Sequence, residues 1–286
     1  MIDLVMLVHS LISAGTYLAA KRALAELSPF ELGLARFVLA AAIYAALLFR
    51  RRLQVARRDA WRLAALGFVA IPLNQGLFLG GLSLTTPGHA ALLYAMTPVF
   101  VFLLALLRRE ERSSGLKVAG IVTAFAGAAT VLASRGQLGR WSIRGGVMGD
   151  LLVLCAVVAW AVYVVWGKPY AERYGVVATT GLTVIAGTIL YLPIGAALSR
   201  GEHFRALSPA GWASLAYLVV LTSVVAYLLY YFALAREDAS RVAIWSNTQP
   251  VLTALLAWAV YGDRITGAFV VGGALVIAGV AMTQRG

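Results

Sequence analysis

Long runs of apolar residues, separated by short polar connections, follow one another through the whole chain. A bilayer core about 30 Å thick is crossed by roughly 20 apolar helical residues, and a short loop after each brings the requirement to about 28 residues per span. The pattern in 286 residues therefore predicts an all-α polytopic membrane protein with ten transmembrane helices. The predicted spans are 4–20, 30–49, 63–82, 89–107, 118–133, 147–166, 177–198, 212–234, 242–261 and 265–282.

The connections between these spans are short, among them 83–88, 108–117, 168–175 and 262–264, so no room is left for a soluble domain. The first span could be a cleaved secretory signal. No basic residue precedes it, and Lys21 and Arg22 follow it, so we interpret it as a retained span.

Composition points the same way. The chain is 61% hydrophobic and 13% charged, whereas soluble proteins carry about 25% charged residues. A soluble enzyme is therefore excluded. Cys155, the single cysteine, lies in an apolar run, so no intrachain disulfide or thiolate metal cluster is expected.

The basic residues predict the orientation. With both termini in the cytoplasm, fifteen Lys and Arg residues fall in inner connections and eight in outer ones, which favours this topology in a bacterial-type inner membrane. The net charge of +12 then reflects topology and attraction to anionic membrane lipid. A nucleic-acid partner is not expected, because the basic residues are scattered over many loops.

The chain also contains an internal repeat. At an offset of 152 residues, positions 98–129 match 250–281 at twelve of thirty-two positions, including Pro98 with Pro250, Gly120 with Gly272 and Gly127 with Gly279. Near an offset of 147, Lys21 aligns with Lys168. We therefore expect a first five-helix repeat at 1–134, a linker loop at 135–146 and a second repeat at 147–286.

Five is an odd number, so the second copy must enter the membrane inverted relative to the first. Inverted repeats are typical of secondary transporters, in which one half moves against the other and exposes a central site alternately to each side. The alternative is a duplication that only built a stable helical bundle.

The duplicated proline spans, the charged turns 109–112 and 262–264, and the glycine-rich spans after them resemble the drug/metabolite transporter superfamily and, within it, the EamA branch. Glu110 stands where that family usually has glycine in the turn. The chain is most similar to the YddG-type exporters of aromatic and other neutral amino acids. This resemblance implies a ten-helix carrier with a central cavity lined by spans one, three, four, six, eight and nine.

Aromatic and polar residues within those spans are candidates for solute binding. Asn74 and Phe78 lie one helical turn apart in span three, and Tyr227, Tyr230 and Tyr231 form a stripe in span eight. The alternative for the tyrosines is an aromatic belt at the membrane interface. Pro72 would free a backbone carbonyl nearby.

Span one places His9, Ser13 and Thr16 on one face, and span six offers Trp160 and Tyr163. A histidine inside a span is a functional candidate, although a histidine that only packs is an equal alternative for His9. His89 is a candidate at the start of span four, with a water-facing loop position as the alternative.

The segments before the two repeated prolines are expected to form the centre of the site, since proline leaves backbone carbonyls free. Pro98 and Pro250 themselves are candidate hinges, and a purely mechanical kink is the alternative. The candidate residues here are Tyr94, Met96, Trp245, Asn247 and Gln249.

The twelve acidic residues all fall in loops or at span ends, so a carboxylate relay in the middle of the membrane is not expected. Proton coupling would have to use His9, His89 or Asp150; uniport and exchange are equally open. We expect no cofactor and no metal. The spacings Gly76 to Gly80 and Gly145 to Gly149 are interpreted as helix packing rather than phosphate binding.

Together these features predict a secondary transporter that exports neutral, above all aromatic, amino acids by alternating access. The alternative on the same fold is an exporter of other small metabolites or drugs. A nucleotide-sugar carrier would need basic residues inside spans, where Arg36 is the candidate. A membrane enzyme is disfavoured by three dispersed histidines, and a channel by the lack of a polar ring. The sequence does not fix the oligomeric state.

Overall fold

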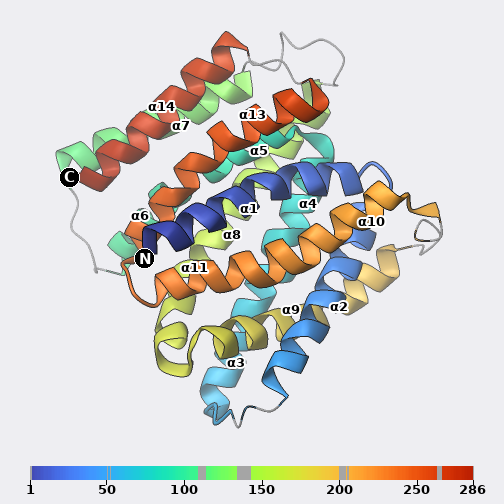
Figure 1. The fold of residues 1–286 in the computed structure, drawn as a ribbon. Helices are drawn as coiled ribbons and strands as arrows, with labels where there is room; N and C mark the ends of the chain where they lie inside the picture. Colours follow the sequence, from blue (N-terminus) through green and yellow to red (C-terminus); the bar gives the residue numbers. More distant parts are fainter. Residues whose placement is uncertain are drawn as a thin grey trace.

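The computed structural model describes residues 2–49, 51, 53–108, 114–133, 143–199, 204, 206–262 and 266–285. All regular elements within these ranges are helices (Figure 1). Seven helices in the described residues are long and apolar enough to cross a membrane, and two shorter apolar helices span Gly115–Gly127 and Gly267–Thr283. The chain is therefore a polytopic membrane protein, while the count of ten crossings stays a prediction.

Helix occurs in each of the ten predicted ranges, and several of these ranges are divided into more than one element. The first half contains α1 (Ile2–Ala23), α2 (Pro29–Leu48), α3 (Arg57–Phe68), η1 (Val69–Gln75), α4 (Gly76–Leu84), α5 (Pro87–Tyr94), α6 (Thr97–Leu107) and α7 (Gly115–Ala133). The second half contains α8 (Ile143–Tyr174), α9 (Val176–Leu198), α10 (Pro209–Ala216), η4 (Tyr217–Ala226), α11 (Tyr227–Leu234), α12 (Ala239–Ala243), η5 (Ile244–Thr248), α13 (Gln249–Tyr261) and α14 (Gly267–Arg285).

Capping residues explain where several helices begin. Ser28 accepts a hydrogen bond from the amide of Glu31, and the Glu31 carboxylate accepts one from the amide of Ser28, which forms a capping box at α2. Ser208 caps α10 by accepting from the amide of Gly211.

Some predicted boundaries are wrong. The connection predicted at 168–175 is helical through Tyr174, because α8 continues past Pro169. At its other end α8 begins at Ile143, inside the linker expected at 135–146, of which 135–142 lie outside the described residues. Turn residues 109–112 and 263–264 are also outside the described residues.

Two spans contain π-helical segments at matching places. One is η1, which includes Pro72, and the other is η4; both continue into α-helix without a break. The wider π turn leaves some carbonyls without helical partners, and such segments are frequent at functional sites. In η4 the Ser223 hydroxyl donates to the carbonyl of Leu218 at 2.8 Å, and the Tyr44 hydroxyl donates to the carbonyl of Ser223 at 3.1 Å.

Glycines bring several helix pairs into close contact. A Cβ at Gly120 would lie 2.5 Å from the Gly279 carbonyl oxygen, and one at Gly127 would lie 2.7 Å from that of Gly272. This register makes α7 and α14 antiparallel neighbours, and they lie side by side in Figure 1. In the same way, Gly81 of α4 packs against Gly149 of α8.

The packing role predicted for the pair Gly76 and Gly80 is wrong. A Cβ at either glycine would meet nothing within 4 Å, because the neighbouring Gly81 faces α8 instead. Glycine spacing in the sequence therefore indicated the right span and the wrong helix face.

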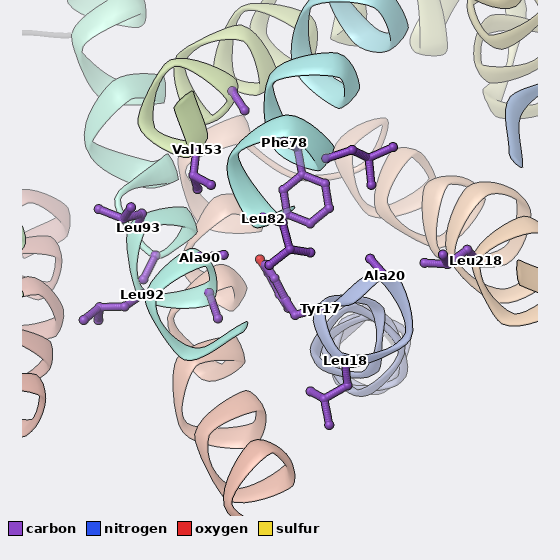
Figure 2. Close-up of a cluster of buried hydrophobic side chains, with 14 of the residues drawn as sticks. Tyr17, Leu18, Ala20, Phe78, Leu82, Ala90, Leu92, Leu93, Val153 and Leu218 are labelled. Atoms are coloured by element: carbon purple, nitrogen blue, oxygen red, sulfur yellow. The ribbon is translucent and has the colours of Figure 1, made fainter. Parts of the chain in front are cut away.

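The buried apolar side chains form two clusters. One lies where α1, α4 and α5 meet, and Figure 2 shows Tyr17, Phe78 and Leu82 pointing toward one another within it. The second lies between α2, α8, α9 and α11. Many large apolar side chains are exposed on the outside of the bundle, such as Leu4 at 66% and Trp258 at 62%, as expected for surfaces that face lipid.

Candidate functional site

A cavity of about 80 Å³ lies where the two buried clusters meet. Its wall combines aromatic rings, hydroxyls, amides and one guanidinium, drawn from elements of both halves of the chain. The residues that line it are His9, Ser13, Thr16, Tyr17, Arg36, Gln75, Phe78, Tyr94, Trp160, Thr222, Ala226, Tyr227, Tyr230, Ser246 and Gln249.

Six of the twelve side chains expected to bind solute lie on this wall. They are Phe78, Tyr94, Trp160, Tyr227, Tyr230 and Gln249. The structure therefore brings together residues from spans three, four, six, eight and nine. Their role in binding stays a prediction.

The other six predicted residues lie outside the wall. Asn74, Met96 and Tyr163 are buried, and Trp245 and Asn247 are half-buried. His89 is buried at a distance from the cavity, beside Asp150. A binding role for any of these six would require another conformation or an indirect effect.

Asn74 does not line the cavity, but it hydrogen-bonds Tyr94, which does. Its Nδ2 donates to the Tyr94 hydroxyl at 3.0 Å and to the Ala156 carbonyl at 2.7 Å. One amide thus connects η1, α5 and α8. We therefore describe Asn74 as a positioning residue for Tyr94.

Aromatic rings form two groups on opposite sides of the cavity. Tyr17, Phe78 and Tyr94 meet edge to face, with ring centroids 5.6–6.0 Å apart. Trp160 contacts Tyr227 and Tyr230 at 5.5 and 5.4 Å. Edge-to-face contacts of this kind stabilise a rigid apolar surface that suits a planar ring.

His9 connects α1 to the second half. Its Nδ1 lies 3.1 Å from the Ala226 carbonyl oxygen and its Nε2 lies 3.2 Å from the Ser13 hydroxyl. These contacts fit a neutral imidazole that donates from Nδ1 and accepts at Nε2. His9 lines the cavity, and a functional role for it stays a prediction beside the packing role.

Two further hydrogen bonds cross between α1 and the second half. The Tyr17 hydroxyl donates to Gln249 Oε1 at 2.9 Å, and the hydroxyls of Thr16 and Thr222 lie 2.8 Å apart. Polar contacts therefore join α1 to elements of the second half along the cavity wall.

Arg36 is the charged residue of the wall, and it is 1% exposed. Its Nε donates to the Ser223 hydroxyl at 2.7 Å and its Nη1 donates to Gln75 Oε1 at 3.0 Å. The guanidinium thus joins η4 to the last residue of η1, the two π-helical segments.

A second polar cluster lies near the start of α5 and α8. Asp150 Oδ1 accepts from the Thr85 hydroxyl at 2.5 Å, and Asp150 Oδ2 lies 3.3 Å from His89 Nδ1. Lys21 Nζ donates to the carbonyl of Thr85 at 2.7 Å. His89 is therefore buried and paired, so its alternative as a water-facing loop residue is wrong.

The two repeated prolines lie at the first turns of new helices. Pro98 is at the start of α6, directly after the turn at Ala95 and Met96, and Pro250 is at the start of α13, after the 3₁₀ segment η5. Both spans are therefore interrupted beside the cavity. Hinge motion at these places stays a prediction.

Several residues of the wall were missed from the sequence as binding candidates. They are polar positions within apolar runs, and all except Arg36 have a polar neighbour in the sequence: Tyr17, Arg36, Gln75, Thr222 and Ser246. Polar residues in the middle of predicted spans were the available signal, because such residues face the bundle interior. Which of them meet depends on the packing of helices that are distant in the sequence.

No group of three or more His, Cys, Asp or Glu side chains that could hold a metal occurs in the described residues. The described wall offers hydrogen-bonding groups, one positive charge and aromatic rings. An apolar helical bundle around a small polar and aromatic cavity is typical of membrane transporters.

Comparisons with known proteins also point to a membrane transporter. The EamA-like transporter family matches the chain twice, at residues 1–133 and 147–285. The chain belongs to this family of the drug/metabolite transporter superfamily.

Relatives match over most of their length. An uncharacterized transporter of Archaeoglobus fulgidus is 32% identical over 275 residues, which cover 96% of this chain and 93% of the relative. A probable terminal-alkyne amino-acid exporter of Streptantibioticus cattleyicolor is 32% identical over 228 residues, or 80% of this chain and 74% of the relative. One solved crystal structure of a protein has a TM-score of 0.73 at 21% identity, covering 99% of this chain and 96% of that one, which shows a shared fold.

Proposed function

We propose that this transporter exports neutral, above all aromatic, amino acids across the inner membrane by alternating access between two inverted five-helix repeats. The observation that carries the proposal is that repeat-related positions line one cavity. At the offset of 152, Phe78 corresponds to Tyr230 and Tyr94 to Ser246, and all four belong to the wall. A site on the axis between two inverted copies is the arrangement that alternating access uses.

Equivalent hydrogen bonds support the repeat. Lys21 Nζ donates to the carbonyl of Thr85, and Lys168 Nζ donates to that of Glu237, each at 2.7 Å. The lysines are 147 residues apart and the acceptors 152, close to the two offsets in the sequence.

The glycines at α7 and α14 support an inverted relation. Gly120 packs on Gly279 and Gly127 packs on Gly272, while the repeat pairs Gly120 with Gly272 and Gly127 with Gly279. Reciprocal contacts of this kind arise when a two-fold axis passes between two equivalent helices. The two separate matches of the family to 1–133 and 147–285 fit the same division.

The solute class follows from the wall. A neutral amino acid needs hydrogen-bonding groups for its two charged ends and an apolar surface for its side chain. The two aromatic groups supply the surface, and Arg36 with the wall's hydroxyls and amides supplies the polar contacts. The amino-acid exporter among the relatives is consistent with this class.

The packing differs between the two ends of α8. Near the start of α8, Gly81 and Gly149 pack closely and Asp150 pairs with His89. Toward its other end, a hollow of about 600 Å³ lies between α3, α6 and α8, with Arg62, Arg108 and Trp166 on its wall. In the topology with cytoplasmic termini this hollow lies on the cytoplasmic side, and it shares none of its described lining residues with the central cavity.

Efflux from proteoliposomes tests the function. The purified protein is reconstituted in liposomes that contain labelled Phe, Trp, Ala, Lys or a nucleotide sugar, and the release of each is followed. We expect release of Phe and Trp, with Ala slower and Lys retained. Release of the nucleotide sugar alone would contradict amino-acid export and favour export of other metabolites on the same fold.

A further inference from the structure

We propose that Arg36 binds the carboxylate of the solute and makes a free carboxylate a requirement for binding. This inference rests on the proposed function for the identity of the solute. It adds that the protein recognises the carboxylate end of the amino acid and that Arg36 is the side chain that binds it.

The first step is that Arg36 has spare donors. A guanidinium carries five N–H donors and stays charged in proteins. Two of these donors are used within the protein: Nε donates to Ser223, and Nη1 donates to Gln75. Among the described residues, Nη2 donates to no protein acceptor and no carboxylate forms an ion pair with the guanidinium.

The second step concerns charge. A cation removed from water carries a penalty of several kcal/mol unless a counter-charge and hydrogen bonds replace its hydration. Ser223 and Gln75 are neutral, and the described residues of the cavity wall include no Asp or Glu. The wall is therefore electropositive, and an anionic group of the solute is the counter-charge that it accommodates.

The third step is that other donors face the same space. The hydroxyls of Tyr227 and Tyr230 are buried and line the cavity, and that of Tyr227 has no hydrogen-bond partner among the described residues. A carboxylate has two oxygens with about four acceptor positions. It can therefore accept from Nη2 of Arg36 and from a tyrosine hydroxyl at once.

The amino end of the solute has weaker partners. The wall offers it neutral oxygens, such as those of Ser13 and Ser246, and ring faces, among them that of Trp160. The carboxylate should thus contribute more to binding than the ammonium. An acid that lacks the amino group should still bind, and an amine that lacks the carboxylate should not.

Four matched ligands separate the two poles: phenylalanine, 3-phenylpropionate, phenylalaninamide and phenethylamine. We expect the first two to raise the thermal unfolding midpoint of the purified protein and to compete with labelled phenylalanine in proteoliposomes. The amide and the amine should bind at least about tenfold more weakly, as expected when one partner of a buried charge pair is removed.

Two variants remove or neutralise the positive charge of Arg36. Arg36→Gln deletes it, and Gln75→Glu keeps Arg36 but supplies an internal carboxylate at the position 3.0 Å from Nη1. Both should abolish the preference for acid over amide. Gln75→Glu has nearly the same shape but loses the donor from Nε2 to Asn74 Oδ1, so Gln75→Met, which loses the same donor without adding a charge, is compared with it and should keep the preference for acid over amide.

Tyr44→Phe is the matched control for packing. The Tyr44 hydroxyl donates to carbonyls of the same η4 segment, and Tyr44 does not line the cavity. This variant should keep the preference for acid over amide, because a purely structural disturbance of η4 leaves the charge of the wall unchanged.

The outcomes separate this assignment from the proposed function. Equal binding of amide and acid, or a preference that persists in Gln75→Glu, would overturn the role of Arg36 while leaving amino-acid export in place. Binding of 3-phenylpropionate without transport of any amino acid would keep the carboxylate site and overturn the export function. A protein that responds to no carboxylate would overturn the role of Arg36.

Discussion

One tyrosine hydroxyl at the cavity wall destabilises the protein when no solute is bound. The hydroxyl of Tyr227 is buried without a partner among the described residues, whereas the hydroxyl of Tyr231 on the same helix donates to the Tyr163 carbonyl at 3.1 Å. An unpaired buried hydroxyl costs about 1–3 kcal/mol. Residues retained at such a cost are candidates for contact with a solute.

Tyr227→Phe should therefore raise the thermal unfolding midpoint of the empty protein, because it removes an unpaired polar atom. The same variant should weaken the stabilisation that phenylalanine gives. Tyr231→Phe is the control and should lower the midpoint, with a loss of about 0.5–1.5 kcal/mol for one hydrogen bond. Destabilisation of the empty protein by both variants would mean that the Tyr227 hydroxyl is satisfied.

Glu26, in the connection between α1 and α2, is a residue whose charge matters for stability. Its carboxylate accepts from the amide and the hydroxyl of Ser208 and pairs with Arg22 at 2.6 Å. The hydrogen bonds from Ser208, and then Arg22, lower the pKa of this carboxyl from its ordinary value of 4.5. The stabilisation is therefore present above pH 4.5 and is lost as the pH falls through the lowered pKa.

Glu26→Gln should thus be less stable than the wild type at neutral pH, and the difference should shrink in acid. Thermal unfolding of both proteins from neutral pH to about pH 3 measures it. A difference that is the same at both ends of this range would show that the charge of Glu26 contributes nothing.

At the scale of the helix, close packing at glycine holds α7 against α14. Gly120→Val would place its Cβ 2.5 Å from the Gly279 carbonyl oxygen, so the helices must separate. We expect a loss of about 1–3 kcal/mol, as for other overpacked sites. Gly267→Ala is the control, because a Cβ there meets nothing within 4 Å. Thermal unfolding compares the two, and an equal response would contradict this packing.

The apolar pattern predicted where helices occur, since burial in lipid requires long apolar runs and imposes helix on them. It did not predict the length of α8. Gly167 and Pro169 indicate a break, but Lys168 donates to the Glu237 carbonyl and Arg173 pairs with Asp59 at 2.8 Å, and these contacts hold the added turns. Contacts between distant segments cannot be found from local pattern.

Part of the cavity wall was likewise predictable from the sequence. Trp160, Tyr227 and Tyr230 were found because aromatic residues inside predicted spans suit a binding surface. Arg36 was noted as an intramembrane cation, but its place on the wall depends on Gln75 and Ser223, which come from two other spans. Which side chains pair with a buried charge depends on tertiary packing, which the local sequence pattern does not predict.

For the whole molecule, the two halves predict a defined topology. The proposed five spans per half would place both termini on one side, and the start of α1 and the end of α14 lie on the same side of the bundle in Figure 1. In a Cys155→Ser background, cysteines introduced at Asp3 and Gln284 should react with an impermeant thiol reagent from the cytoplasmic side. A cysteine at Ser83, in the last turn of α4, should react from the opposite side. Labelling of the two ends from opposite sides would contradict an inverted pair of halves.

Access to the cavity tests the central claim most directly. Ser13→Cys in the Cys155→Ser background places a thiol on the cavity wall. Impermeant thiol reagents are applied to one or the other face of oriented vesicles, with and without phenylalanine. A carrier with one central site predicts labelling from either face and protection by phenylalanine on both. Labelling from a single face, or labelling that phenylalanine leaves unchanged, would contradict alternating access to an amino-acid site.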